Sequence, residues 1–148
     1  MFRAWLRIKQ VKEGEEMEIS VSLEEGVKVS THFDGFTVKT DQPVKSGGEG
    51  SYPDPFSYFL SSIAACAGFF VLRFCQSRDL PTSGIKIFMT NDWNKSGKVV
   101  ENIKIDIQLP KNFPEKYRPA IIRTVDQCTV KRTILRQPEF SVIATIEE

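Results

Sequence analysis

Cysteine is the residue type in this chain whose placement is most suited to chemistry. The 148 residues include three cysteines. Cys66 lies in the small, uncharged stretch SSIAACAGFF, residues 61–70, and Cys128 lies in VDQCTVKRT. Two neighbouring thiols can carry a redox cycle, because a sulfenic acid on one condenses with the other to form a disulfide. Free cysteines are also frequent as small buried hydrophobic residues. Cys66 is therefore either a core residue or one member of a redox pair.

The reactivity of each thiol depends on how its thiolate is stabilised. Cys66 lies roughly 18 Å beyond Asp54, where the sequence predicts that its helix begins, and a helix dipole acts only over the first turn. Cys128 is followed by two cations, Lys131 and Arg132. These cations lower the pKa of Cys128 if they fold back, and are otherwise solvated charges at a helix end.

Other residues that carry chemistry are few. Cys75 falls on the opposite face of the predicted helix from Cys66, so we expect it to be structural. His32 is the single histidine and lies in a strand-like stretch, which favours a surface strand residue. Because the sequence has no Cys-x-x-Cys pair and no Cys/His cluster, we expect no metal site and no cofactor.

Charge and hydropathy limit the classes of partner. The formal net charge is +1 and no basic patch is interleaved with aromatic residues, so we expect no nucleic-acid partner. The uncharged run from Phe56 to Leu72 is at the low edge of the length of a membrane span, but Asp54 and Arg73 bound it closely. We expect a buried core helix and no membrane partner. The N-terminus MFRAWLRIKQ lacks the apolar run of a secretory signal, so the expected location is the cytoplasm.

The order of the predicted elements indicates one α+β domain over residues 1–148. An N-terminal strand meander covers residues 2–40, within which residues 2–11 are a candidate additional strand. Turns are predicted at Glu24-Glu25-Gly26 and at Asp34-Gly35, the latter a strong two-residue hairpin signal.

A central helix is predicted next, at about residues 54–78. It follows a glycine- and proline-rich loop, with Asp54 as a good N-cap and Pro55 as a good first helical residue. Apolar residues cover nearly its whole circumference, so we expect a central position in the fold.

Strands and a second helix are predicted for residues 84–148. Residues 84–93 and 102–110 are strands, and the second of them alternates strictly in polarity. Residues 114–128 are a helix that Pro119 either kinks or restricts to the part after about residue 118, and residues 139–148 are a closing strand. This order favours antiparallel sheet around a buried helix.

Two stretches of the sequence carry a family resemblance. They are GGEGSYPDPFSYFLSSIAACAGFFVLRFCQSRDLP, with Cys66, and IDIQLPKNFPEKYRPAIIRTVDQCTVKRTI, with Cys128. Their glycine-rich loop, small-residue helix with a cysteine and second helix ending in a cysteine resemble the OsmC/Ohr family of osmotically induced and organic-hydroperoxide-resistance proteins. The resemblance covers residues 45–148 well and the N-terminal meander by topology only.

The resemblance implies an OsmC-like fold of antiparallel sheets around two central helices, in an intertwined homodimer. It also implies that Cys66 attacks a peroxide oxygen and becomes a sulfenic acid, which Cys128 resolves to a disulfide. A dithiol reductant then reopens the disulfide. The apolar side chains of Phe59, Phe69 and Phe70 would suit organic hydroperoxides as substrates.

The sequence departs from the pattern of the peroxidase members of this family. Those members use a glutamate at the start of the central helix and an arginine from the N-terminal half to activate the thiolate. Here the glutamate position is Phe56 or Ser57, and no arginine lies between Arg7 and Arg73. The resemblance therefore indicates a divergent member, with four candidate substitutes for the missing pair: Lys39, Lys45, Glu49 and Asp54.

Three functions remain open at this point. The first is a thiol-dependent organic hydroperoxide reductase with Cys66 and Cys128 as its redox pair. The second is a protein that uses the same pair on other small sulfur compounds. The third is a dimer that binds an apolar small molecule and whose cysteines are packing residues.

Overall fold

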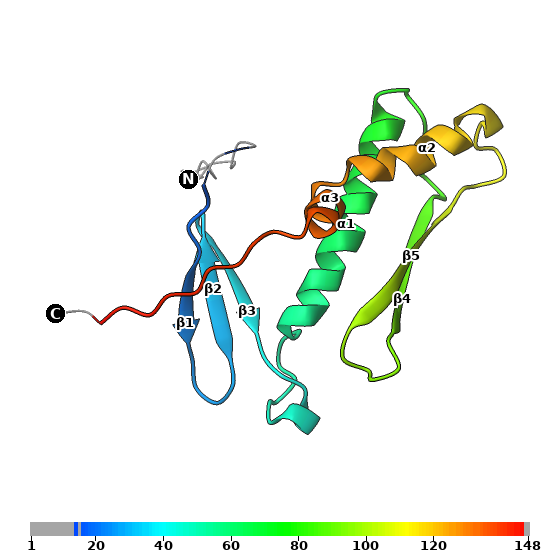
Figure 1. Ribbon diagram of the computed structural model, residues 1–148. Helices are drawn as coiled ribbons and strands as arrows, with labels where there is room; N and C mark the ends of the chain where they lie inside the picture. The colour runs from blue at the N-terminus through cyan, green and yellow to red at the C-terminus, as the bar shows by residue number, and fades with distance from the viewer. Residues whose placement is uncertain (1–13, 15, 147–148) are drawn as a thin grey trace, which may run out of the picture. The chain divides into compact units, whose positions relative to one another are not determined.

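The computed structural model describes residue 14 and residues 16–146 of the chain (Figure 1). The chain divides into two compact units after Phe59. The additional strand expected at residues 2–11 lies outside the described residues.

The first unit contains a three-stranded antiparallel sheet. Its strands are β1 (Ser20–Leu23), β2 (Val29–Phe33) and β3 (Phe36–Thr40), in the order β1-β2-β3. The turn between β2 and β3 has positive φ at Asp34 (46°) and Gly35 (80°), as a two-residue hairpin turn requires. The predicted meander and its hairpin signal are confirmed for the described strands.

One face of this sheet is apolar and largely uncovered. Side chains on neighbouring strands share a face when their residues are direct partners, as Val21 is with Thr31 and Leu23 with Val29. Val21, Leu23 and Phe36 are all exposed. The apolar residues on this face, which also carries Thr31 and Thr40, are Val21, Leu23, Val29, Phe33, Phe36 and Val38.

A short loop carries the chain from the sheet to the central helix, and Asp41 organises it. The Asp41 carboxylate is buried and accepts hydrogen bonds from the backbone N–H groups of Gln42, Glu49 and Ser51. These bonds hold the pKa of Asp41 below its usual value, and that from Ser51 contributes most to the lowering. The loop also contains the 3-10 turn η1 (Val44–Ser46).

Helix α1 (Pro55–Gln76) confirms the helix expected at about residues 54–78. Asp54 caps it: Oδ1 accepts hydrogen bonds from the N–H groups of Phe56 and Ser57. The Ser57 hydroxyl donates to Oδ2 and is the main cause of the lowered pKa of Asp54. The sequence signals for the start of this helix are therefore correct.

Only one face of α1 is covered. Its buried residues are Ile63, Ala67, Val71, Phe74 and Cys75, while the side chain of Phe69 is 54% exposed. By length and composition α1 is apolar enough to cross a membrane, with 28% of its most apolar window buried, although core helices of soluble proteins meet the same criterion. The expectation that α1 is covered all round is not met within one chain.

The second unit contains a two-stranded antiparallel hairpin and two further helices. The strands are β4 (Lys86–Trp93) and β5 (Val100–Gln108), and the helices are α2 (Arg118–Thr124) and α3 (Thr129–Arg136). The 3-10 turns η2 (Glu115–Tyr117) and η3 (Val125–Gln127) flank α2. Figure 1 shows α2 crossing the C-terminal half of α1.

The core of this unit lies where α1 meets α2. The buried side chains of Val71, Phe74 and Cys75 pack with Ile121 and Val125. The inward residues of the hairpin cover the cluster, as the alternation predicts, and they are Ile85, Ile87, Ile105, Ile107 and Leu109. The α+β class and antiparallel sheets predicted from the sequence are thus confirmed.

The helix expected over residues 114–128 is regular only from Arg118, with Pro119 in its first turn, which is one of the two alternatives that the sequence left open. The end of this helix needs correction, because residues 125–127 form the 3-10 turn η3. A third helix then begins, which the sequence analysis did not include. The closing strand expected at residues 139–148 is wrong for residues 139–146, which belong to no strand. A strand forms only against a neighbouring strand, and none of the described strands pairs with this segment.

Candidate functional site

Cys66 lies midway along α1 in the second unit and is half-buried. Small neighbours surround it, and a Cβ added at Gly68 would meet nothing within 4 Å. No other segment therefore packs closely against α1 at Gly68. Cys66 is therefore partly open to solvent in one chain.

Cys128 is placed differently from the sequence expectation. It does not end a helix but lies between η3 and α3, where it is the N-cap of α3. Its Sγ accepts a hydrogen bond from the backbone N–H of Lys131, with 3.4 Å between sulfur and nitrogen. The side chain is only 1% exposed.

The fold brings these two cysteines together. The thiols of Cys66 and Cys128 form a hydrogen bond with each other, and neither is in a disulfide. The pKa of Cys128 is raised, chiefly by burial and next by the hydrogen bond with Cys66. The N–H groups of Lys131 and Val130 act in the opposite direction and lower the pKa.

Lys131 acts on Cys128 through its backbone and not through its ammonium group. The Nζ atom lies 2.5 Å from Oδ1 of Asp126, so the charge is engaged in an ion pair. Neither of the two expectations for this cation describes it fully, because it is neither folded back onto the thiol nor simply solvated.

Cys75 and His32 lie apart from the thiol pair. Cys75 is fully buried in the core cluster, and burial raises its pKa, partly offset by Arg78. His32 lies in the first unit, where its ring nitrogens hydrogen-bond Ser22 and Thr37 on the two neighbouring strands. Both positions agree with the structural roles expected for them.

The candidate substitutes for the missing glutamate and arginine have local partners in the first unit. The Lys39 ammonium lies 5.7 Å from the centre of the Tyr52 ring. Glu49 pairs with Lys28 at 2.5 Å, and Asp54 caps α1. Lys45 is exposed in η1.

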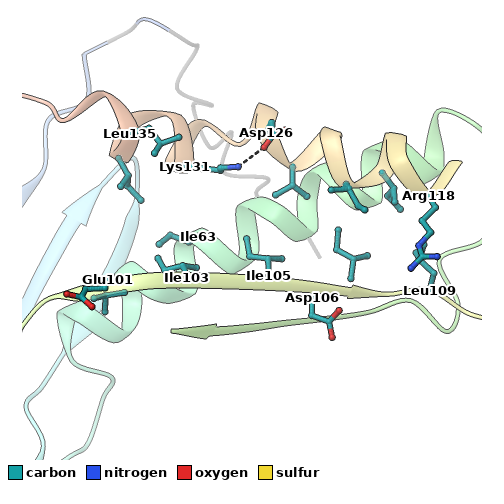
Figure 2. Close-up of a pocket in the computed structure, with 16 residues that line it drawn as sticks. Ile63, Glu101, Ile103, Ile105, Asp106, Leu109, Arg118, Asp126, Lys131 and Leu135 are labelled. Carbon is teal, nitrogen blue, oxygen red and sulfur yellow. Dashed lines mark hydrogen bonds and ion pairs between the residues drawn. The ribbon is translucent and has the colours of Figure 1, made fainter. Parts of the chain in front are cut away.

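The second unit also contains an apolar groove that the sequence analysis did not identify. It has a volume of about 660 Å³ and lies between β5, Ile63 of α1, and the α2–α3 segment (Figure 2). Figure 2 shows the Lys131–Asp126 pair in its α2–α3 wall and Arg118 at one end. Its apolar lining includes Ile63, Ile103, Ile105, Ile121, Ile122, Val125, Ile134 and Leu135. The alternating isoleucines of β5 were the signal that could have located one wall.

Metal binding has no support among the described residues. Within residues 14 and 16–146, no three His, Cys, Asp or Glu side chains gather closely enough to hold a metal ion. The second unit thus holds two interacting thiols and an apolar groove. The lining of the groove includes neither cysteine, but it includes Ile63 and Val125, each three residues before one of them.

A match to a family model defines the family of this chain. A sequence model of the OsmC-like protein family matches residues 48–143, which include both cysteines of the pair. The chain therefore belongs to the OsmC-like family, as the resemblance indicated. Comparison with curated protein sequences gives no match.

Solved structures agree with this assignment at the level of the fold. An OsmC-like protein from Mycoplasma pneumoniae is 16% identical, with a TM-score of 0.65 over 82% of this chain and 89% of that one. An organic hydroperoxide resistance protein from Legionella pneumophila is 15% identical, with a TM-score of 0.54 over 83% and 91%. An OsmC-like protein from Vibrio cholerae is 9% identical, with a TM-score of 0.60 over 80% and 93%.

Proposed function

We propose that this protein is a thiol-dependent organic hydroperoxide reductase, working in the cytoplasm as a homodimer. The observation that carries the proposal is the hydrogen bond between the thiols of Cys66 and Cys128. These residues are 62 positions apart (128 − 66), and a direct contact between their side chains is what a disulfide-forming pair requires.

The two thiols differ in a way that suits two roles. Cys66 is half-buried and open to a substrate, whereas Cys128 is buried and has a raised pKa. In the first step the Cys66 thiolate attacks the distal oxygen of ROOH, the O–O bond breaks, and ROH leaves with a proton. Cys128 then attacks the sulfenic sulfur, which releases water and forms the disulfide. A dithiol reductant returns both thiols and becomes a disulfide itself.

The apolar character of the second unit supports organic peroxides as substrates. Ile63 lies one turn before Cys66 on α1 and lines the groove, and Val125 lines it one turn before Cys128. An alkyl group therefore finds apolar side chains close to the thiol pair, which hydrogen peroxide would not use.

The rate of the first step is expected to be modest. Cys66 lies far beyond the first turn of α1, so the helix dipole does not stabilise its thiolate. The chain also has no arginine between Arg7 and Arg73, where a planar, permanent cation could hold the thiolate. We expect slower peroxide reduction than in family members that carry the glutamate and arginine.

The homodimer is proposed from the apolar surface that one chain leaves open. Phe69 and Leu72 of α1 are exposed, as are Val21 and Leu23 of the first unit. Soluble monomers rarely expose so much apolar surface, and a second copy would cover it.

The groove supports one alternative function, which is binding of an apolar small molecule. Its volume of about 660 Å³ falls in the range typical of ligand pockets. If this alternative is correct, we expect Cys66→Ala and Cys128→Ala to change neither the affinity for the ligand nor the redox behaviour of the protein.

Thiol counting during oxidation tests the main proposal. Fully reduced protein receives one equivalent of cumene hydroperoxide, and free thiols are counted over time. We expect the loss of two thiols, with no loss in Cys66→Ser and loss of one thiol in Cys128→Ser. Cys75→Ala is the matched control, because it removes a buried thiol outside the pair and leaves the loss of two unchanged. Peroxide-dependent loss that persists in Cys66→Ser would contradict the proposal.

A further inference from the structure

We propose that the Cys66–Cys128 disulfide reopens in one direction: the reductant attacks the sulfur of Cys66, and Cys128 leaves as a thiolate held by the N-terminus of α3. The inference rests on the redox pair of the proposed function, and adds which sulfur carries the mixed disulfide and which residues receive the negative charge.

Access to the two sulfurs is unequal. Cys66 is half-buried, while Cys128, the residue that joins η3 to α3, is only 1% exposed. Thiol–disulfide exchange requires an in-coming thiolate to reach one sulfur directly. Within the second unit, the sulfur within reach is that of Cys66.

The position of Cys128 supplies backbone N–H groups that favour its thiolate as a leaving group. Its Sγ already accepts the N–H of Lys131 at the N-terminus of an eight-residue helix, Thr129–Arg136. The positive end of a helix dipole stabilises a thiolate at this point. The first turn of α3 contains no acidic residue that would oppose the charge.

The influences that raise the pKa of Cys128 in the reduced protein change when the disulfide opens. Burial persists, but the hydrogen bond and the charge interaction with Cys66 also raise this pKa. In the mixed disulfide Cys66 has neither a thiol proton nor a charge, so both of these influences are removed. The N–H groups of Val130 and Lys131, which lower the pKa, remain in place.

The step balances as an ordinary thiol–disulfide exchange. A reductant thiolate forms a bond to Sγ of Cys66, the bond between the two protein sulfurs breaks, and its electron pair stays on Sγ of Cys128. The second thiol of a dithiol then attacks the reductant sulfur of the mixed disulfide and releases the Cys66 thiolate. Both protein thiolates take up protons, and the reductant leaves as a disulfide.

Trapping the mixed disulfide tests the direction of opening. The Cys66–Cys128 disulfide is first formed with diamide, so that its formation does not depend on any peroxidase activity. The protein is then exposed briefly to 2-mercaptoethanol, a monothiol whose second exchange needs another molecule, so that an early quench catches the mixed disulfide. The quench is N-ethylmaleimide, and the products are mapped by peptide mass. We expect the mercaptoethanol adduct on Cys66 and the maleimide on Cys128.

The outcomes separate this inference from the proposed function. An adduct on Cys128, or an equal division between the cysteines, overturns the inference and leaves the peroxidase proposal standing. Failure of diamide to link the two cysteines overturns it as well. If diamide forms the disulfide but cumene hydroperoxide does not, the peroxidase proposal fails while the direction of opening is still measured.

A charge change at the start of α3 tests the role of the helix N-terminus. Thr129 is exposed in the first turn, and Thr129→Glu places a carboxylate there, whereas Thr129→Gln is the matched neutral control. A leaving thiol departs more slowly as its pKa rises. We therefore expect Thr129→Glu to slow opening by a few-fold relative to Thr129→Gln, with the difference shrinking at high salt.

A measurement in the Cys128→Ser variant tests whether the charge of Thr129→Glu slows opening only by repelling the attacking anion. In Cys128→Ser, alkylation of Cys66 by the anion iodoacetate should proceed at the same rate with Thr129→Glu and with Thr129→Gln. Equal opening rates for the two Thr129 variants with the disulfide intact would overturn the role assigned to α3.

Discussion

Cys128 experiences opposing influences that come from different parts of its surroundings. Burial and the neighbouring Cys66 favour the neutral thiol, while the backbone of α3 favours the thiolate. Cys75 is affected mainly by burial, which also raises its pKa. Because folding favours the neutral form of both thiols, we expect the free energy of unfolding to decrease at alkaline pH.

The expected pH dependence has a definite sign. Because folding raises the pKa of Cys75 and of Cys128, their contribution to stability is complete below the unfolded-state value of about 8.5 and is lost as pH rises toward the folded values. We expect the urea concentration at the midpoint of unfolding to decrease as the pH rises above about 8.5. Cys75→Ala, although less stable at neutral pH, should show a shallower alkaline decline. The same decline in this variant as in the unmodified chain would contradict the assignment to Cys75.

At the level of single residues, the sequence identified the correct cysteines to compare but not their surroundings. It separated Cys75 from the pair by helical geometry, which depends only on spacing along one helix. The contact between Cys66 and Cys128 depends on how α1 packs against the α2–α3 segment, and no local pattern encodes that packing. The N-cap role of Cys128 was missed because cysteine is not among the residues preferred at helix N-termini.

Among the elements, α1 shows how a strong local signal sets a boundary. Asp54 satisfies two backbone N–H groups that the first turn of the helix would otherwise leave unpaired. Its position directly before Pro55 made this start predictable from the sequence. The cap can be removed by one substitution without touching the core of the second unit.

We expect Asp54→Ala to destabilise the protein by about 1 kcal/mol, the usual cost of losing an N-cap. Asp54→Asn is the control, because its amide oxygen still accepts the hydrogen bonds from Phe56 and Ser57. Urea unfolding of the three proteins, at neutral pH and one protein concentration, measures the difference. An alanine variant as stable as the asparagine variant would show that the cap contributes nothing.

The closing strand is the element that sequence reasoning placed wrongly. The alternation in EFSVIATIEE is typical of a strand, but alternation measures only suitability for one. A ladder also needs a free edge in the right place, and residues 139–146 have no pairing partner within the described chain. The same reasoning succeeded for β2 and β3 because a short turn supplies the partner locally.

For the whole molecule, the exposed apolar surface is the main argument for association. The uncovered face of α1 includes Phe69 and Leu72, and neither packs in the core of the second unit. Charged side chains placed on such a face would cost much more in a dimer that buries it than in a monomer that leaves it in water.

We expect Leu72→Glu to convert a dimer to a monomer at micromolar concentration. Sedimentation velocity measures the molar mass directly, and Ser77→Glu is a control that adds the same charge at an exposed, polar position on the turn after α1. An unmodified chain that sediments at the mass of one 16.8 kDa subunit would remove the dimer from the proposed function.

The unpaired C-terminal segment also bears on how the chain avoids aggregation. Its residues SVIATI contain no charge, proline or glycine, and Phe140, Val142, Ile143 and Ile146 are almost fully exposed. Short segments of this composition are prone to form intermolecular β-structure when they are left open. The sequence places Glu139 before the segment and Glu147 and Glu148 after it, where charges act as gatekeepers against such stacking. We therefore expect these glutamates to limit stacking between copies of the chain through this segment.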